Sequence, residues 1–178
     1  LAVLEQKWKA EEYRTCVSIS TQLLQLNPDR PSFYIQRAKG YLKINMMQEV
    51  VDDCNKALQL RPQHGVAYVL QAAANFSCVD KARSRGEERQ ALQYLHRAQE
   101  KLRLAREVEL AIVHDSDFQK YNSLCEQTYR LITTETSPTA GGGGGGGGMG
   151  GAPNGVRDFA EQGYRAGQRQ QQQQRERD

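Results

Sequence analysis

The side chains best suited to bind a metal ion or attack a substrate are scattered along this 178-residue chain. The histidines and cysteines are His64, His96, His114, Cys16, Cys54, Cys78 and Cys125. A zinc site needs clustered ligands, and none of these cysteines forms a Cys-x-x-Cys pair. We therefore expect no metal and no cofactor. Because Cys16 and Cys54 fall on apolar helical faces, we interpret the cysteines as reduced thiols that pack like small hydrophobic residues.

Acidic residues occur in adjacent pairs, which could in principle supply a general acid and a general base. The pairs are Glu11-Glu12, Asp52-Asp53 and Glu87-Glu88, at predicted turns or on polar helical faces. Charged side chains in such positions are usually solvated. The sequence contains no Ser/His/Asp or Cys/His catalytic pattern and no His-Glu-x-x-His pattern. We therefore expect a protein that is not an enzyme and has no small-molecule substrate.

Composition narrows the class of protein further. The chain is 38% hydrophobic with a net charge of +3, enough for one modest domain. So slight a basic excess does not favour a nucleic-acid partner. No apolar run approaches the ~18 residues of a membrane span, and no signal peptide is visible. We expect a cytoplasmic protein, and a piece of a longer one because it begins at Leu1.

The dominant pattern is a sequence that repeats every 34 residues between Tyr13 and His64. Leu-Leu-Gln-Leu-Asn-Pro at 23–28 returns as Ala-Leu-Gln-Leu-Arg-Pro at 57–62. Side chains of matching size recur at the same spacing elsewhere: Trp8, Leu42 and Phe76; Tyr34 and Tyr68; Ala38 and Ala72; Cys16 and Val50. A period of this length, with a proline closing each unit, is typical of a helix–turn–helix solenoid.

The second unit, Pro31 to His64, resembles a tetratricopeptide repeat. The residues that match the family's aromatic, small and closing positions are Tyr34, Ala38, Tyr41, Ala57 and Pro62. Arg37 stands where the family usually has Leu, and Gly40 and Val50 stand where it usually has Ala. The run Asp53 to Leu58 is most similar to repeats of co-chaperones. The resemblance covers roughly residues 1 to 110 and implies an all-α, right-handed solenoid of about three repeats.

The predicted elements follow the repeat until its third unit. Two helices joined at Ala10–Glu12 fill residues 1–26, and helices follow at 31–43 and 48–60. The third unit begins with a helix from Gly65 to Phe76. Val79 to Gly86 then adds about seven residues, which we interpret as a longer solvated turn, with a basic contact site as the alternative.

The second helix of the third unit is predicted to outgrow the repeat. Its apolar residues are Ala91, Leu92, Leu95, Ala98, Leu102, Ala105 and Ile112. One helix of about 25 residues is the simplest interpretation, and a coiled coil with another chain is the alternative. Residues 114–117 should end it, with Asp115 or Ser116 capping a last amphipathic helix at 117–134. That helix would cover the exposed end of the solenoid.

The domain boundaries follow from composition. Residues 1–136 are predicted to form the helical repeat domain. Residues 137–155 contain the glycine run 141–148 and are predicted to be a flexible linker. Residues 156–178, rich in Gln and Arg, are predicted to be a disordered tail. The glycine run is no phosphate-binding loop, because no Gly-Lys-Ser or Gly-Lys-Thr follows it.

The resemblance also implies where a partner would bind, because the first helix of each unit lines the concave face in this family. The expected groove comprises Trp8, Lys9, Ile35, Lys39, Leu42, Lys43, Val69, Ala73 and Phe76. Trp8, Leu42 and Phe76 would stack along it and hold the apolar face of a peptide. The alternative is that these three side chains only pack neighbouring helices.

The function implied by the resemblance is a protein-interaction adaptor or scaffold. The best-known ligands of the family are acidic carboxy-terminal tails of heat-shock chaperones, held by a clamp of Lys and Asn side chains. The corresponding positions here are Leu1, Glu5, Gln36, Val66 and Leu70. We therefore expect a groove for a peptide or protein partner that lacks this carboxylate clamp. The alternative is a structural segment of a larger multidomain co-chaperone, for example of J-domain type, or of a multisubunit assembly.

Overall fold

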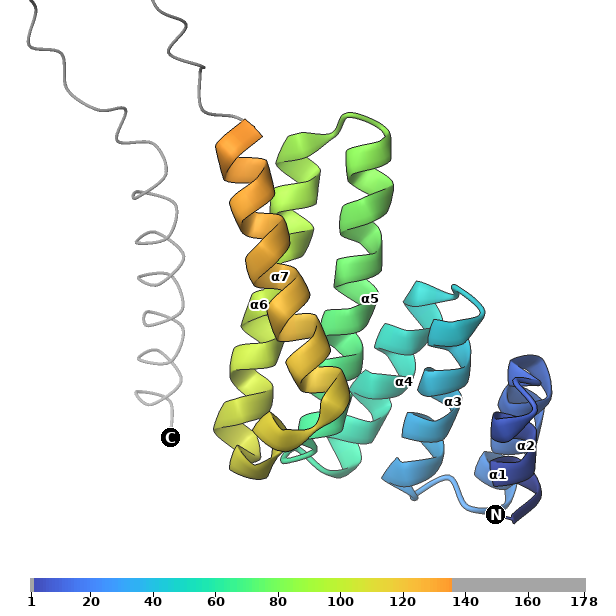
Figure 1. The fold of residues 1–178 in the computed structure, drawn as a ribbon. Coiled ribbons are helices and arrows are strands. Elements are labelled where there is room, and N and C mark those ends of the chain that lie inside the picture. Colours follow the sequence, from blue (N-terminus) through green and yellow to red (C-terminus); the bar gives the residue numbers. More distant parts are fainter. Residues whose placement is uncertain (1, 136–178) are drawn as a thin grey trace, which may run out of the picture. The chain divides into compact units, whose positions relative to one another are not determined.

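A computed structural model describes residues 2–135, and its helices follow one another as a stack (Figure 1). The helices in this range are α1 (Ala2–Lys9), α2 (Tyr13–Leu26), α3 (Pro31–Lys43), α4 (Met47–Leu60), α5 (Gly65–Ser84), α6 (Glu88–Val108), the 3-10 helix η1 (Leu110–His114) and α7 (Ser116–Glu135). No strand occurs among these residues, so the predicted all-α solenoid is confirmed. The predicted linker at 137–155 and tail at 156–178 lie outside the described range.

The helices pair as the repeat predicts. α1 packs on α2, α3 on α4, and α5 on α6. Each later first helix also contacts the second helix of the preceding unit: α3 with α2, α5 with α4, and α7 with α6. The first helices additionally touch one another, α3 with α5 and α5 with α7. This double contact makes each unit part of the next unit's core.

The turn inside each unit uses one residue with left-handed backbone geometry. These residues are Glu11, Asn45 and Gly86, with φ values of 56°, 64° and 72°. They occupy the same place in the repeat, since each lies directly between a first and a second helix. Glycine accepts this geometry without steric cost, asparagine tolerates it, and glutamate is the least suited of the three. The three units therefore share the backbone conformation of this turn as well as the order of their helices.

Two apolar clusters form the interior. The second-unit cluster comprises Ile35, Ala38, Val50, Cys54, Ala57, Ala67, Leu70 and Ala74. The third-unit cluster comprises Val69, Ala72, Phe76, Val79, Ala82, Ala91, Leu95, Ala98, Leu102, Ala105, Ile112, Phe118, Cys125 and Ile132. α5 contributes residues to both clusters, from opposite faces of one helix. α5 therefore lies between the two clusters and packs in both.

The predicted long turn at Val79 to Gly86 is wrong. α5 stays helical to Ser84, and the chain turns only at 85–87. Val79 and Ala82 continue the apolar spacing that Phe76 ends in the sequence interpretation, and both are buried in the third-unit cluster. The ammonium group of Lys81 also donates a hydrogen bond of 3.0 Å to Oδ1 of Asn45, at the α3–α4 turn. The inserted residues thus lengthen the helix pair, because they have apolar neighbours to bury against.

The predicted 25-residue helix is also wrong in its length. α6 ends at Val108, and Glu109 takes an extended conformation before η1 begins. The Glu109 carboxylate accepts a 2.9 Å hydrogen bond from the backbone N–H of Gly65, where α5 starts. A side chain at Gly65 would displace this carboxylate, since its Cβ would lie 2.6 Å from the Glu109 Oε2 atom. The break therefore satisfies a free N–H at the start of α5.

The predicted capping helix is present as α7. Asp115 caps its start, because Oδ1 accepts hydrogen bonds from the backbone N–H groups of Asp117 and Phe118 at 2.9 and 3.0 Å. Phe118, Cys125 and Ile132 face the third-unit cluster. The outer face is exposed and mostly polar: Gln119, Lys120, Ser123, Gln127 and Arg130. α7 therefore covers the end of the third unit.

Candidate partner-binding surface

Four of the nine predicted groove residues are buried. Ile35, Val69, Ala73 and Phe76 expose 5%, 2%, 0% and 7% of their surface. The Phe76 ring meets the Tyr121 ring of α7 edge-on, with centroids 6.2 Å apart. α7 covers this end of the predicted row, so Phe76 packs helices together. These four residues support the surface from within and present few atoms to a partner.

The other five predicted residues are accessible, and we call them the basic surface. Trp8, Lys39 and Leu42 are half-buried, while Lys9 and Lys43 are exposed. They come from α1 and α3, the first helices of the first and second units. The accessible residues of the predicted set therefore lie in the first and second units.

Aromatic side chains organise the basic surface at the α1–α2 pair. The Trp8 and Tyr13 rings lie with centroids 5.4 Å apart, and the Lys43 ammonium lies 5.8 Å from the centroid of the Tyr13 ring. Such cation–π contacts hold a lysine stem against a ring while its charge stays near solvent. The buried indole Nε1 of Trp8 has no hydrogen-bond partner among the described residues.

The charge of this region is uncompensated. Lys9, Lys39 and Lys43 form no ion pair with any residue that the structure describes. The pKa of the nearby His64 imidazole is lowered, first by burial and then by the positive charge of Arg61, with Lys39 adding to the effect. Glu109 acts in the opposite direction. Burial is thus the main reason that the charged form of His64 is disfavoured, and Lys39 contributes only the smallest part.

Arg37 fixes the position of α3, and sequence reasoning missed its role. Its Nε and Nη2 atoms donate to Oδ2 and Oδ1 of Asp53 on α4 at 2.8 and 2.7 Å. A third bond of 3.3 Å reaches Thr21 on α2. The Arg37 side chain is 20% exposed and that of Asp53 only 6%, so the pair is largely desolvated. Arg37 stands where the family usually has Leu, and its charge is therefore neutralised by Asp53 of the same unit.

The third unit has an uncharged equivalent of the hydrogen bond between Arg37 and Thr21. Gln71 stands 34 residues after Arg37, and its side-chain amide donates a 2.8 Å hydrogen bond to Asn55 on α4. Asn55 in turn stands 34 residues after Thr21. α3 and α5 are thus each tied to the preceding second helix by polar side chains 16 residues apart. The sequence contains this signal, because polar residues recur at the 34-residue spacing, as Thr21 and Asn55 and as Arg37 and Gln71.

Tyr34, Asp52, Asn55 and Lys56 surround the Arg37–Asp53 pair in an open hollow of about 510 Å³. The Arg37 guanidinium lies 5.9 and 5.8 Å from the centroids of the Tyr34 and Tyr41 rings. Because its charge is already matched by Asp53 and its faces by aromatic rings, this hollow offers a ligand little that is unpaired. Its role is to hold the helices together.

No group of three or more His, Cys, Asp or Glu side chains in residues 2–135 could hold a metal ion. Burial raises the pKa of the Cys125 thiol to about 12 and raises the pKa of the Cys54 thiol further. No described helix is long and apolar enough to cross a membrane.

No protein-family model matches the chain. Two curated proteins match part of it. The heat shock protein sti1 homolog of Schizosaccharomyces pombe is 33% identical over 69 residues, which is 39% of this chain and 12% of that protein. The SGT1 homolog of Oryza sativa subsp. japonica is 32% identical over 75 residues, covering 40% of this chain and 20% of that protein. The chain thus spans only a small part of these relatives.

Solved structures match a larger share of the chain. The Sgt2 TPR domain from Aspergillus fumigatus has a TM-score of 0.62 at 16% identity, covering 83% of this chain and 87% of that one. The TPR2B domain of yeast Sti1 in its pHsp70 complex has a TM-score of 0.56 at 20% identity, covering 72% and 91%. The first TPR of Spaghetti (RPAP3) bound to the HSP90 peptide SRMEEVD has a TM-score of 0.55 at 20% identity, covering 72% and 89%. The predicted resemblance to TPR domains of the co-chaperone kind is confirmed.

Proposed function

We propose that this chain, whose described helices have the tetratricopeptide-repeat fold, is a non-enzymatic protein-interaction module. Its basic surface would hold a peptide or protein partner that combines apolar and acidic side chains. Trp8 and Leu42 would contact the apolar groups, and Lys9, Lys39 and Lys43 the acidic ones. Ile35, Val69, Ala73 and Phe76 would form the buried layer behind this surface.

The observation that carries this proposal is the set of unpaired lysines beside half-buried apolar side chains. Elsewhere in the second unit the largely desolvated guanidinium of Arg37 has its counter-ion in Asp53. The three lysines have none among the described residues. Lysines that face solvent without a counter-ion attract anionic partners over roughly one Debye length, ~8 Å at physiological salt.

The mode of binding we propose differs from a carboxylate clamp. Among the clamp positions that are described, Glu5 is exposed and acidic, while Gln36 and Val66 are half-buried. Leu70 exposes 3% of its surface and belongs to the second-unit cluster. These groups supply none of the clamp's cations. We therefore expect the peptide SRMEEVD, which is bound in the RPAP3 structure, to bind weakly here.

A peptide library displayed on phage tests the proposal. We expect selection on the full chain to enrich peptides that combine acidic and large apolar residues. The variant Lys39→Glu/Lys43→Glu should lose those peptides, while Lys56→Glu, which changes a lysine on α4 outside the basic surface, should retain them. Enrichment of the same peptides by the double variant would show that the basic surface is not the binding site.

A structural role inside a larger protein is the second candidate function. It is favoured by the short coverage of the curated relatives, 12% and 20% of their lengths, because those proteins contain much besides these repeats. In that case the basic surface would pack permanently against another domain or subunit, for instance in a multidomain co-chaperone of J-domain type. A purified longer form in which Lys39 and Lys43 are protected from acetylating reagents would support this role over the first.

The extent of the domain is part of the proposal. Among the described residues, the buried members of both apolar clusters lie between Ile35 and Ile132. We therefore propose that the domain ends near residue 136 and that residues 137–155 serve as a linker to the segment 156–178. A chain that stops at Pro138 should unfold within a few degrees of the full chain. We also place the protein in the cytoplasm, in keeping with four free cysteines.

A further inference from the structure

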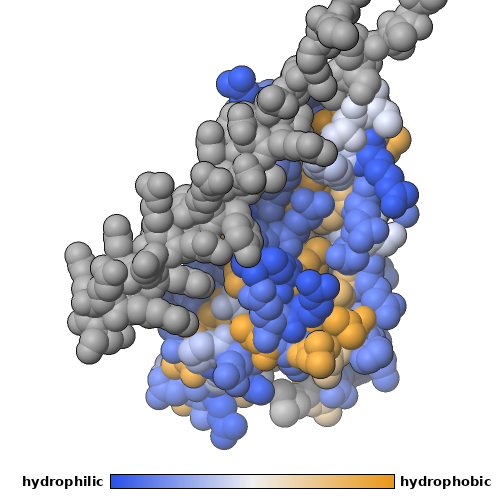
Figure 2. All heavy atoms as spheres, turned by 90° about the vertical axis from the view of Figure 1, so that its left-hand side faces the viewer, coloured by the Kyte–Doolittle hydropathy of each residue, from blue (hydrophilic) through white to orange (hydrophobic). Residues whose placement is uncertain are grey.

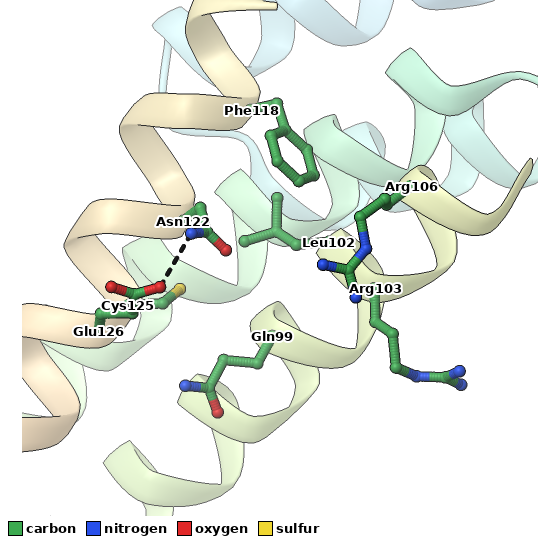
Figure 3. A pocket seen from close by; sticks show the side chains of 8 residues that line it. All are labelled: Gln99, Leu102, Arg103, Arg106, Phe118, Asn122, Cys125 and Glu126. Carbon is green, nitrogen blue, oxygen red and sulfur yellow. Dashed lines mark hydrogen bonds between the residues drawn. The ribbon is translucent and has the colours of Figure 1, made fainter. Parts of the chain in front are cut away.

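The face that α6 and α7 form is mostly hydrophilic, with apolar atoms between the polar side chains (Figure 2). A pocket of about 230 Å³ opens there, with Leu102 and Phe118 side by side at its floor (Figure 3). At its rim, Arg103 is paired with carboxylates of its own helix, whereas Arg106 is not paired within residues 2–135. Leu102 and Phe118 expose only 2% and 8% of their surface, so the pocket offers a partner few apolar atoms. The more accessible chemistry of the third unit lies at the turn between α5 and α6.

The turn between α5 and α6 carries a run of basic residues around a serine. Lys81, Arg83 and Arg85 surround Ser84, which is the last residue of α5. Because α5 and α6 are longer than α3 and α4, this turn projects beyond the α3–α4 turn (Figure 1). Lys81, Ser84 and Arg85 are exposed, and a Cβ at the following Gly86 would meet no atom within 4 Å. The hydroxyl of Ser84 is therefore accessible to another protein.

Ser84 differs from the other exposed serines and threonines of residues 2–135 in the charge around it. Three basic residues and one acidic residue, Glu87, lie within three positions of it in the sequence. The others have at most one Lys or Arg within that distance: Ser18, Ser32, Ser116, Ser123 and Thr134. Protein kinases select substrates in part by the charge pattern beside the hydroxyl. A kinase with acidic groups around its substrate site would therefore select Ser84 among these hydroxyls.

The Ser84 hydroxyl is also connected to a contact between the second and third units. Its Oγ donates a 2.9 Å hydrogen bond to the carbonyl of Lys81, one turn earlier on α5. The ammonium of Lys81 in turn donates a 3.0 Å hydrogen bond to Oδ1 of Asn45, which ties α5 to the α3–α4 turn. Side chains three residues apart are neighbours on a helix. A group added to Ser84 would therefore lie beside the Lys81 side chain.

We propose that Ser84 is a phosphorylation site for a protein kinase that recognises basic residues, and that its phosphate draws Lys81 away from Asn45. Oγ of Ser84 attacks the γ-phosphorus of ATP, and the bond from that phosphorus to the bridging oxygen breaks, which releases ADP. The hydroxyl proton passes to a carboxylate of the kinase. The phosphoserine carries roughly two negative charges near neutral pH. An ammonium group is attracted more strongly by such a dianion than by the neutral amide oxygen of Asn45.

The phosphate would also weaken the last turn of α5. It replaces the hydrogen that Ser84 donates to the carbonyl of Lys81. It also places negative charge at the carboxyl end of a helix, where the helix dipole is already negative. Helix ends fray readily, so the change should stay within residues 81–86 and leave the third-unit cluster intact. The expected result is a looser contact between α5 and the α3–α4 turn.

The first experiment measures phosphate transfer from ATP to the full chain by a purified serine kinase that prefers basic residues. We expect mass spectrometry to locate phosphate on Ser84. Arg85→Glu should slow this transfer about tenfold, because it reverses one charge of the basic run. Arg97→Glu is the matched control, an exposed charge on α6 outside the run, and should change the rate less than about twofold. Unchanged melting temperatures will show that both variants fold.

A synthetic peptide of residues 78–90 completes this experiment, because it presents the same sequence without the fold. We expect the kinase to modify the peptide and the full chain at the same serine. If the peptide is not modified, the basic run is not recognised. If only the peptide is modified, the fold withholds Ser84. Either result would overturn the proposal, and so would equal slowing by Arg85→Glu and Arg97→Glu.

The second experiment follows the contact between Lys81 and Asn45 by NMR. Phosphorylation of Ser84 should shift the side-chain amide signals of Asn45, because the amide loses its ammonium partner. The amide of Asn75, which donates to the Gln71 carbonyl elsewhere on α5, should keep its signals. In Lys81→Met the Asn45 signals should already be shifted and should change little on phosphorylation. Asn45 signals that stay in place after Ser84 is phosphorylated would show that the phosphate does not release Lys81.

Discussion

The second and third units follow the same repeat but are stabilised differently. In the second unit, α3 and α4 are joined across a small cluster by the buried Arg37–Asp53 pair. In the third unit, α5 and α6 are longer, and their interface is apolar over its length. The alanines at which helices approach each other recur in both units, as Ala57 and Ala98, and neither exposes any surface. The comparison indicates that both units require a small residue where their helices approach closely. The polar contacts between helices, in contrast, differ from one unit to the other.

The most damaging change should be a large side chain at that shared position. Ala57→Arg and Ala98→Arg each force a guanidinium into a fully buried contact. Overpacking and an unpaired buried charge together cost several kcal/mol, which is comparable to the whole stability of a small domain. We expect both variants to lose cooperative unfolding, as followed by circular dichroism. Ala111→Arg is the control, since Ala111 is exposed in η1, and should melt like the unchanged chain.

A smaller effect should distinguish the two units at one repeat position. Phe76 exposes 7% of its surface, whereas Leu42, its equivalent in the second unit, is half-buried. Phe76→Ala should therefore cost about 3–5 kcal/mol and Leu42→Ala about 1–2 kcal/mol in the free energy of unfolding. Only Leu42→Ala should also weaken peptide capture by the remaining folded protein. Equal losses of stability would contradict the difference in burial on which the basic surface depends.

Removing the two polar links should change stability by different amounts. Asp53→Ala leaves the Arg37 guanidinium without its partner in a largely desolvated place, which should cost about 3 kcal/mol. Gln71→Leu removes a buried amide whose oxygen has no hydrogen-bond partner among the described residues. It should change stability by less than about 1 kcal/mol, because Asn55 is exposed and can bind water. Urea titrations of both variants measure the contrast, and a loss at Gln71 as large as that at Asp53 would contradict it.

The weakest expected effect is a dependence on pH at the junction of the two units. The folded-state pKa of His64 lies below the ordinary value of 6.5, because burial and then Arg61 disfavour its charged form. The unfolded chain therefore takes up this proton first, so stability should decrease as the pH falls below 6.5 and level off below the folded-state pKa. His64→Gln should lose less stability than the unchanged chain between pH 7.5 and 5.5. The same slope in both proteins would exclude His64 as the cause.

Much of the fold could be predicted because the same pattern of residues occurs in more than one unit. The 34-residue spacing, the closing prolines and the recurring alanines fix the helix pairs of the first two units. The extension of α5 was missed because Val79 and Ala82 stand among charged residues, so their apolar spacing was overlooked. The end of α6 at Glu109 was missed for a different reason. Glu109 interrupts the apolar spacing of the helix, but its hydrogen bond to Gly65, 44 residues away, cannot be inferred from the neighbouring sequence.

The candidate surfaces were predictable only in part. Repeat position identified the residues of the basic surface, but it could not tell that α7 would bury Phe76 while Leu42 stayed accessible. That distinction comes from which helix packs next, and the last unit of a stack has different neighbours from the others. The pocket of about 230 Å³ between α6 and α7, whose lining includes Arg103 and Arg106, had no counterpart in the sequence interpretation. Its lining residues are ordinary polar side chains, and only packing shows that Arg103 is paired and Arg106 is not.

Because α5 belongs to both clusters, the two ends of the stack should resist a pulling force differently. α1 and α2 belong to neither cluster, so a force applied at the amino terminus meets the least resistance there. Pulling should peel off α1 and α2 first and then α3 and α4, while α5 stays clamped by α6 and α7. A force applied from the carboxyl end would meet the larger cluster at once. An unfolding machine would therefore find this chain easier to unravel from one end than from the other.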